Sequence, residues 1–196
     1  LEAIEALETC SNLFYHRAML SMEPLGPSRV DMRRAEETAR EGLALSERNG
    51  DFMYPSLSLA LGLAMPIESM DRAAGAYEDG IRHTDMQLQP NLYVVLSAAL
   101  AEACAVHQME TQDPVPGKVA GEALSAAFGI INRYTHMTSN AFLQFAVARA
   151  SLAVGLPSAA LSFILFGTSS GLYDLDVVDA FINNIGVVGS AIVMCV

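Results

Sequence analysis

The stretch Leu57-Ser-Leu-Ala-Leu-Gly-Leu-Ala64 has a pattern of large and small residues that recurs later in the chain. Leu96-Ser-Ala-Ala-Leu-Ala-Glu-Ala103 and Leu143-Gln-Phe-Ala-Val-Ala-Arg-Ala150 repeat it, each with leucine first and a small residue three and seven positions later. Spacings of three and four residues place side chains on one face of a helix. We therefore expect related helices whose small residues let a neighbouring helix approach closely. Phe181–Val188 is a weaker copy, and Leu7–Phe14 is a degenerate one.

A second pattern lies between these stretches. It has a small residue, an apolar residue four positions later and, in most copies, another small residue after three more. The copies are Ala35-Ala39-Gly42, Ala73-Tyr77-Gly80, Ala120-Leu124-Ala127 and, more loosely, Ala159-Phe163-Phe166. From each copy to the next leading residue of the first pattern, the steps are 22, 23, 23 and 22 residues. Two helix types thus alternate with a period of about 38 residues, which predicts stacked antiparallel helix pairs.

One interval in this scheme is longer than the others. From the first pattern to the second, the steps are 16, 24 and 16 residues. The long interval contains Met109–Gly117, which includes Pro114 and Pro116. Proline and glycine mark turns, so we expect a turn-rich insertion on the surface here.

Helix-breaking residues between the patterns give approximate helix boundaries. Asn49-Gly50, Pro66, Pro90 and Gly155 fall between the periodic segments, where glycine can end a helix and proline cannot continue one. The sequence therefore predicts an all-α superhelix (solenoid) of nine helices, at about 1–19, 31–48, 53–65, 69–86, 91–108, 118–134, 139–154, 157–167 and 175–194. We expect one helical-repeat domain over 1–196, with a degenerate N-terminal helix and loop at 1–30, repeat pairs at 31–172 and an apolar C-terminal helix at 173–196.

The repeated residues resemble the tetratricopeptide family. Ala73, Tyr77 and Gly80 are similar to its second-helix signature, and Leu57, Ala60, Leu61 and Ala64 to its first. The resemblance covers about 35–190, but most copies lack the usual tryptophan, tyrosine and closing proline, and the period exceeds about 34 residues. It implies a curved scaffold whose first-type helices line the concave side. Other helical-hairpin solenoids fit nearly as well.

The resemblance also implies a surface for a protein or peptide partner. Residues of the first-type helices that are not committed to packing would face it: Tyr54, Ser58, Asn91, Tyr93, Asn140 and Gln144. These side chains are polar, uncharged and partly aromatic. We expect them to hydrogen-bond an extended peptide or a helix.

Composition narrows the classes of partner. The formal net charge is −11, from 22 acidic against 11 basic residues, and such a chain repels the phosphates of nucleic acids. Its three cysteines, Cys10, Cys104 and Cys195, form no disulfide framework, which favours an intracellular setting. Residues 150–173 carry no charge, but glycines and a proline interrupt them, so we expect buried helices and no membrane span.

Two residue groups carry chemistry in principle. Cys104 and His107 are three positions apart on one predicted helix, the minimum for a cysteine nucleophile or half a zinc site. Asp174, Asp176 and Asp179 cluster at a predicted helix start, where acids also act as caps. Glu102 lies within an alanine-rich helix. If it is buried it is a candidate for a perturbed pKa, but such a residue more often lies at the helix edge and reaches solvent. We expect structural roles, with no catalytic residue, metal or cofactor.

The sequence thus favours a protein-interaction scaffold over an enzyme. A structural self-assembly subunit is the first alternative, with the apolar C-terminal end as the contact between copies of a homo-oligomer. A ligand-sensing regulatory domain is the second, and an all-α enzyme comes last.

Overall fold

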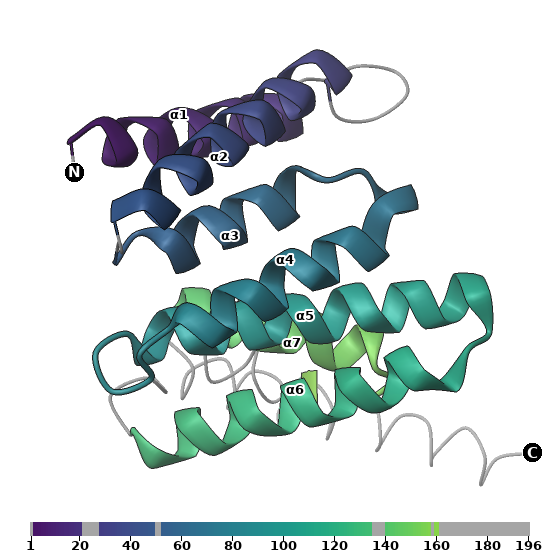
Figure 1. Cartoon of the computed structure of the whole chain (residues 1–196). Helices are drawn as coiled ribbons and strands as arrows, with labels where there is room; N and C mark the ends of the chain where they lie inside the picture. Colours follow the sequence, from purple (N-terminus) through teal and green to yellow (C-terminus); the bar gives the residue numbers. More distant parts are fainter. Residues whose placement is uncertain (1, 21–27, 50–51, 135–139, 158, 161–196) are drawn as a thin grey trace, which may run out of the picture.

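The protein is all-α throughout the part that the structure describes. The computed structural model describes residues 2–20, 28–49, 52–134, 140–157 and 159–160, without the side chains of 48, 49, 141 and 142. Its elements are α1 (Glu2–Leu20), α2 (Arg29–Asn49), α3 (Tyr54–Ala64), the 3₁₀ turn η1 (Ile67–Ser69), α4 (Met70–His83), α5 (Pro90–Thr111), α6 (Pro114–Arg133) and α7 (Ala141–Ala153) (Figure 1). The all-α prediction is confirmed. Seven of the nine predicted helices are present, and the last two lie in, or run into, residues outside this description.

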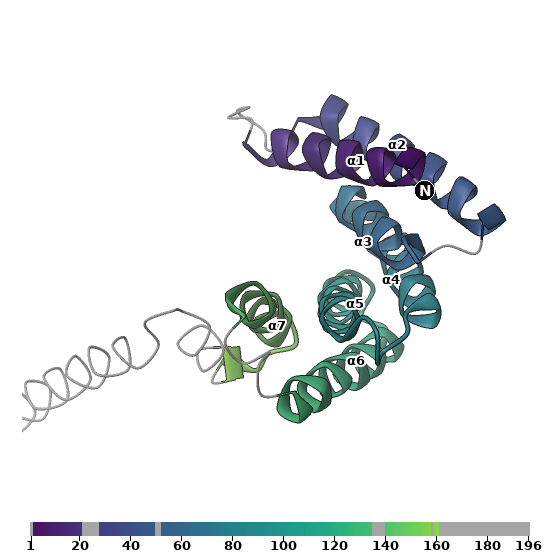
Figure 2. The ribbon, with the colours of Figure 1, turned by 90° about the vertical axis from the view of Figure 1, so that its left-hand side faces the viewer.

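Consecutive helices run back and forth and stack along a curve. In Figure 2, α1 and α2 occupy one end of this curve, and α6 and α7 the other. Each helix from α2 to α5 packs against the next one in the chain, and α5 packs against α7 as well. By contrast, α6 barely touches α7. Three neighbouring helices, α4, α6 and α7, therefore cover α5.

The connection between α5 and α6 differs from the sequence-based expectation. We expected a turn-rich insertion at Met109–Gly117, but only two residues, Gln112 and Asp113, separate the helices. Gln112 ends α5 in the left-handed conformation, with φ of 60°. The Asp113 carboxylate then accepts from the N–H of Val115 at 3.0 Å, and Pro114 occupies the first turn of α6, where no N–H is needed. The extra residues lengthen two helices and form no loop.

Residues that the two patterns singled out lie in the interior. The leading leucines and the closing alanines of the first pattern are at most 2% exposed: Leu57, Leu96, Leu143, Ala64, Ala103 and Ala150. Gly42 and Gly80 occupy the same place in the second pattern. A Cβ at Gly42 would lie 2.7 Å from Cδ2 of Leu57, and one at Gly80 would lie 3.0 Å from Cδ2 of Leu96. The small residue of one helix thus accommodates the leading leucine of the next.

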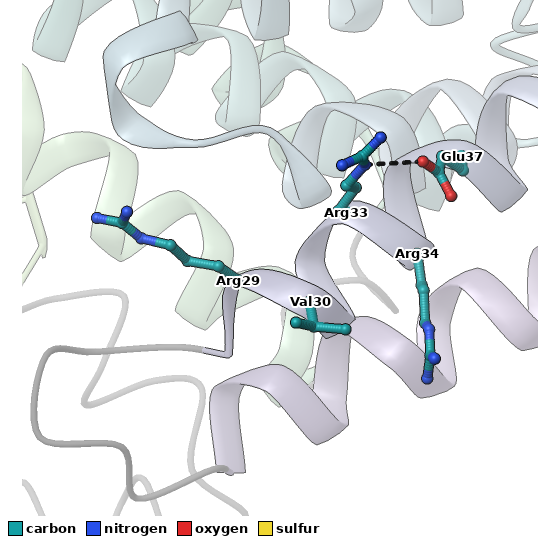
Figure 3. A pocket seen from close by; sticks show the side chains of 5 residues that line it. All are labelled: Arg29, Val30, Arg33, Arg34 and Glu37. Carbon is teal, nitrogen blue, oxygen red and sulfur yellow. Dashed lines mark hydrogen bonds and ion pairs between the residues drawn. The ribbon is translucent and has the colours of Figure 1, made fainter.

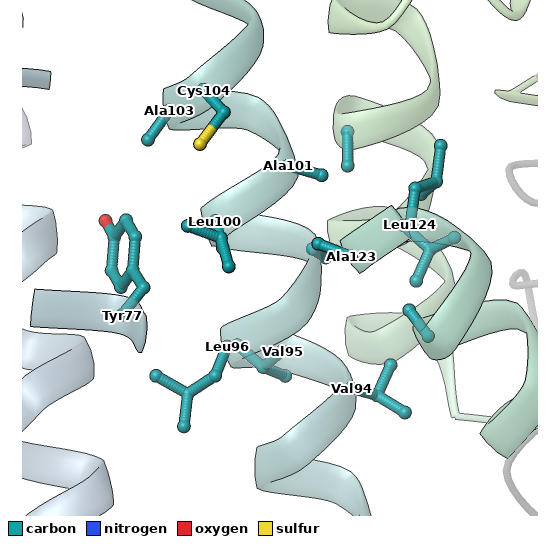
Figure 4. Packing of buried hydrophobic residues seen from close by; sticks show 14 of the residues in the cluster. Tyr77, Val94, Val95, Leu96, Leu100, Ala101, Ala103, Cys104, Ala123 and Leu124 are labelled. Atoms are coloured by element: carbon teal, nitrogen blue, oxygen red, sulfur yellow. The ribbon is translucent and has the colours of Figure 1, made fainter. Parts of the chain in front are cut away.

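The largest core cluster surrounds α5. Figure 4 shows side chains from both ends of this helix directed at its neighbours, with Tyr77 of α4 on one side and Leu124 of α6 on the other. Ten of the 22 residues of α5 are buried. By length and composition, α5 is the one described helix that could cross a membrane, yet 56% of its apolar window is buried inside the protein. Burial in the helical core accounts for its apolar sequence.

Candidate functional site

Three of the six residues expected to contact a partner are buried in this structure. Tyr54 is 8% exposed, Ser58 is 1% exposed and Gln144 is 2% exposed. A Cβ added at Gly80 of α4 would lie 2.9 Å from the Cβ of Ser58. Ser58 therefore lies beneath α4. These side chains therefore have little surface to offer a partner in this conformation.

Tyr54 packs against the end of the next helix. Its ring lies 4.2 Å from that of His83, measured between centroids, and Nδ1 of His83 lies 2.8 Å from the carbonyl oxygen of Asp79. Burial, followed by the negative charges of Asp79 and Glu47, raises the pKa of the Tyr54 hydroxyl. Contacts of this kind hold the start of α3 against the end of α4.

The other three expected residues retain accessible surface. Asn91 is exposed, and Tyr93 and Asn140 are half-buried. Oδ1 of Asn140 accepts from the N–H of Leu143 at 3.4 Å, in the manner of a helix cap. All three lie at the N-terminal ends of α5 and α7, so they form part of one edge of the array and not a continuous strip along it.

A charged pair joins α5 to α7. Nη2 of Arg149 donates to Oε1 of Glu102 at 2.6 Å, with about half of the Arg149 side chain and a third of the Glu102 side chain exposed. Burial alone would lower the pKa of Arg149, but the hydrogen bond and the charge of Glu102 outweigh it, so the pKa is raised. The predicted position of Glu102 at a helix edge is consistent with the exposure of about a third of its side chain.

Two tyrosines lie within electrostatic range of this pair. Tyr77 is 5% exposed, and burial, followed by the charges of Glu102 and Tyr15, raises the pKa of its hydroxyl well above the usual range. The charge of Tyr15 also contributes to the raised pKa of Arg149. The Tyr77 ring reaches this position by passing over Gly62, where a Cβ would overlap the ring.

Apolar side chains flank Arg149 on the surface of α7. Phe145 is 58% exposed and Leu152 is 55% exposed. They lie four residues before and three residues after Arg149, on the same face of the helix. We name Glu102, Phe145, Arg149 and Leu152 the Arg149 surface. It combines exposed apolar area with hydrogen-bond donors and acceptors, as interaction sites commonly do.

The sequence contains a signal for the Glu102–Arg149 pair, although the pair was not predicted from it. Both residues occupy the seventh position of the first pattern, in the copies that begin at Leu96 and Leu143. Equivalent helices that pack side by side bring equivalent positions together, so opposite charges at one position predict an ion pair. Leu63 occupies this position in the copy that begins at Leu57.

The candidate groups for catalysis have little support. Burial, followed by the charge of Glu78, raises the pKa of the Cys104 thiol to about 11, so the reactive thiolate is scarce at neutral pH. Within the described ranges, no three His, Cys, Asp or Glu side chains are placed to hold a metal ion. Asp174, Asp176 and Asp179 lie outside those ranges.

We find no match for this chain among protein-family models, curated proteins or solved structures.

Proposed function

We propose that this chain is a protein-interaction scaffold built as a solenoid of nine helices. Two kinds of contact support the repeat. Leu57 and Leu96 fill the equivalent places at Gly42 and Gly80, and the two seventh-position residues, Glu102 and Arg149, pair across α5 and α7. Contacts that recur with the sequence period are what a stacked array requires.

The observation that carries the proposed function is the Arg149 surface. Exposed apolar side chains at Phe145 and Leu152 favour contact with another protein, because large apolar groups gain by leaving water. The guanidinium of Arg149 has five N–H donors, and one of its nitrogens is engaged by Glu102. Further donors can therefore bind a carbonyl of a partner.

The partner that fits is a peptide segment with apolar side chains and free backbone groups. The Glu102–Arg149 pair is neutral overall, so it does not select a strongly charged ligand. An extended segment offers carbonyls to Arg149 and apolar side chains to Phe145 and Leu152. Asn91, Tyr93 and Asn140 extend the proposed contact to the N-terminal ends of α5 and α7.

Selection from a random peptide library, followed by affinity measurement, tests this proposal. We expect selected peptides to bind about tenfold more weakly to Arg149→Ala and to Phe145→Ala, a loss of about 1.4 kcal/mol. Arg82→Ala is the matched control, since Arg82 is also exposed and ion-paired, with Glu78 and Asp79 of α4. Affinities that fall equally for Arg82→Ala would remove the Arg149 surface as the binding site.

A second pair of variants tests the edge residues separately. If Tyr93 and Asn140 take part, Tyr93→Ala and Asn140→Ala each weaken the same peptides, measured by the same titration. Unchanged affinity in both variants would restrict the site to the Arg149 surface. Failure to select any peptide would contradict the scaffold function itself.

A further inference from the structure

The first helix pair concentrates positive charge in an otherwise acidic chain. Four of the eleven basic residues lie at the end of this pair where α1 finishes and α2 begins: Arg17, Arg29, Arg33 and Arg34. The whole chain has 22 acidic residues. This end therefore differs in charge from the rest of the protein.

Asp31 and Phe14 hold two of the four arginines in place. The Asp31 carboxylate accepts from Nε and Nη2 of Arg17 at 2.7 and 2.5 Å, and Nη1 of Arg34 lies 3.9 Å from Oδ1 of Asp31. Both guanidinium groups lie within 6 Å of the centre of the Phe14 ring. The hydrogen bond from Arg17 holds the pKa of Asp31 below its usual value. The one carboxylate at the centre of the cluster is thus already neutralised.

The other two arginines are available to a ligand. Arg33 pairs with Glu37 at 2.9 Å, but its side chain is 81% exposed, and exposed pairs of this kind are weak. Arg29 forms no ion pair with any residue of the described ranges. Between the arginines, Val30 is exposed at the surface of a hollow of about 400 Å³ (Figure 3).

The hollow has an apolar floor, and its rim carries three guanidinium groups and one carboxylate, that of Glu37, which pairs with Arg33. Val30 and the aliphatic stems of Arg29, Arg33 and Arg34 provide the floor, while the guanidinium groups extend outward. Such a hollow fits an apolar side chain that has carboxylates close to it in sequence. Long-range repulsion from the net charge is largely screened at physiological salt, where the screening length is about 8 Å.

This chain contains a segment of that chemistry. Asp174-Leu-Asp-Val-Val-Asp179 alternates carboxylates with leucine and valine, and its three acids are the only charged residues after Arg149. It lies outside the described ranges and follows α7 in the chain. Figures 1 and 2 both place α7 at the end of the array opposite to α1 and α2. A second copy therefore supplies the segment more readily than the same molecule.

We propose that Asp174–Asp179 of one copy docks in the hollow on α2 of another, so that copies associate head to tail. Leucine or valine enters the hollow over Val30, and the carboxylates pair with Arg29 and Arg33. A head-to-tail contact uses two different surfaces, so it extends into rings or filaments unless it is capped. The proposal needs neither the Arg149 surface nor an external partner.

A peptide titration tests the contact directly. The probe is a labelled synthetic peptide of residues 171–182, and its fluorescence anisotropy is measured as full-length protein is added. We expect at least tenfold weaker binding to Arg29→Glu/Arg33→Glu, and to a peptide with the three aspartates changed to asparagine. Arg82→Glu, a reversal of an exposed arginine on α4, is expected to keep the affinity. Equal binding to both charge-reversal proteins, or preference for an oligonucleotide of similar length, would overturn the proposal.

Mixing two variants tests the head-to-tail geometry. Arg29→Glu/Arg33→Glu disables the hollow and keeps the segment, whereas Asp174→Asn/Asp176→Asn/Asp179→Asn keeps the hollow and removes the charges of the segment. In light scattering, wild-type protein is expected to grow beyond a dimer with concentration, and each variant to remain monomeric. An equal mixture is expected to stop at a heterodimer, because each copy retains one half of the contact. A mixture that remains monomeric, or a hollow variant that assembles like wild type, would contradict the model. Circular dichroism checks that both variants remain folded.

Discussion

The centre of the array and its first helix pair are held together differently. Around α5, large apolar side chains such as Val94, Leu96 and Leu100 are buried against three neighbouring helices. Between α1 and α2, most of the buried residues are small, and polar contacts take a larger share. Oγ of Ser11 donates to the carbonyl of Ala35 at 2.8 Å, and Arg17 pairs with Asp31.

This difference has a physical cause. A helix in the middle of a stack has neighbours on several sides, whereas the described part of α1 packs against α2 and, less extensively, α3. The free energy gained by burying apolar side chains grows with the area removed from water. Helices at the centre of the stack can therefore gain more from this burial than helices at its end. We therefore expect substitutions at the centre to cost more, and the end of the array to open before the centre does.

The largest effect is expected at Leu96. Leu96→Ala leaves a cavity beside Gly80 and should lower the free energy of unfolding by about 2–5 kcal/mol. Leu88→Ala is the matched control, because Leu88 is 71% exposed and its loss should cost less than about 0.5 kcal/mol. Urea denaturation measures both. If both variants lowered the free energy of unfolding by similar amounts, burial at the centre would not be the main source of stability.

The next effect appears at alkaline pH. Burial raises the pKa of Cys104 from 9.0 to about 11, so the folded chain keeps this proton while the unfolded chain loses it. The free energy of unfolding is therefore unaffected by this thiol below pH 9. It falls as the pH rises from 9 to 11, by about 3 kcal/mol in all. Tyr77 acts in the same direction at higher pH, because its pKa is also raised by burial.

Cys104→Ala separates these two contributions. It should flatten the decline between pH 9 and 10, measured by urea denaturation at each pH, whereas Tyr77→Phe should flatten the decline above pH 10. A decline that stays unchanged in Cys104→Ala would show that the thiol is not buried as described.

A smaller effect is expected where the tyrosine ring crosses α3. Gly62→Ala would place a methyl group against the ring of Tyr77, which should cost about 1–3 kcal/mol. Gly75→Ala on α4 is the matched control, since nothing lies within 4 Å of its Cβ position. It should stabilise the helix by about 0.5–1 kcal/mol. Thermal unfolding distinguishes the opposite signs, and a loss in both variants would refute the close approach at Gly62.

The smallest effects concern two serines of the first helix pair. Ser11→Ala removes the hydrogen bond to Ala35 and should cost about 1 kcal/mol. Ser46 is equally buried, but its Oγ has no hydrogen-bond partner among the described residues. Ser46→Ala should therefore be neutral or stabilising by up to about 1 kcal/mol. Chemical denaturation measures the change in the free energy of unfolding for each variant. Changes of the same sign would contradict a hydrogen-bonded Ser11 and a Ser46 that is unpaired within the described ranges.

Much of the fold could be predicted from the sequence because its signals are local. Seven predicted helices agree with the described ones to within a few residues at most ends, since helical periodicity and breakers such as Pro66 act over short distances. The boundary between α5 and α6 was wrong for a related reason. Pro114 was interpreted as part of a loop, whereas proline is equally suited to the first turn of a helix.

The candidate sites could be predicted only in part, because exposure depends on neighbours distant in sequence. Tyr54, Ser58 and Gln144 were expected to face a partner, yet α4 and other elements cover them. Glu102 was singled out by its alanine-rich surroundings, but its partner Arg149 is 47 residues away. Which of the helices that carry the first pattern face each other became clear only from the packing.

Helix content, helix order and the buried positions of the two sequence patterns follow from the chain alone, since spacing along a helix fixes which residues share a face. The joining of Glu102 to Arg149, the passage of Tyr77 over Gly62 and the hollow over Val30 follow only from the packed structure. Each of these combines side chains from different turns or helices, and their meeting depends on how the backbones approach one another.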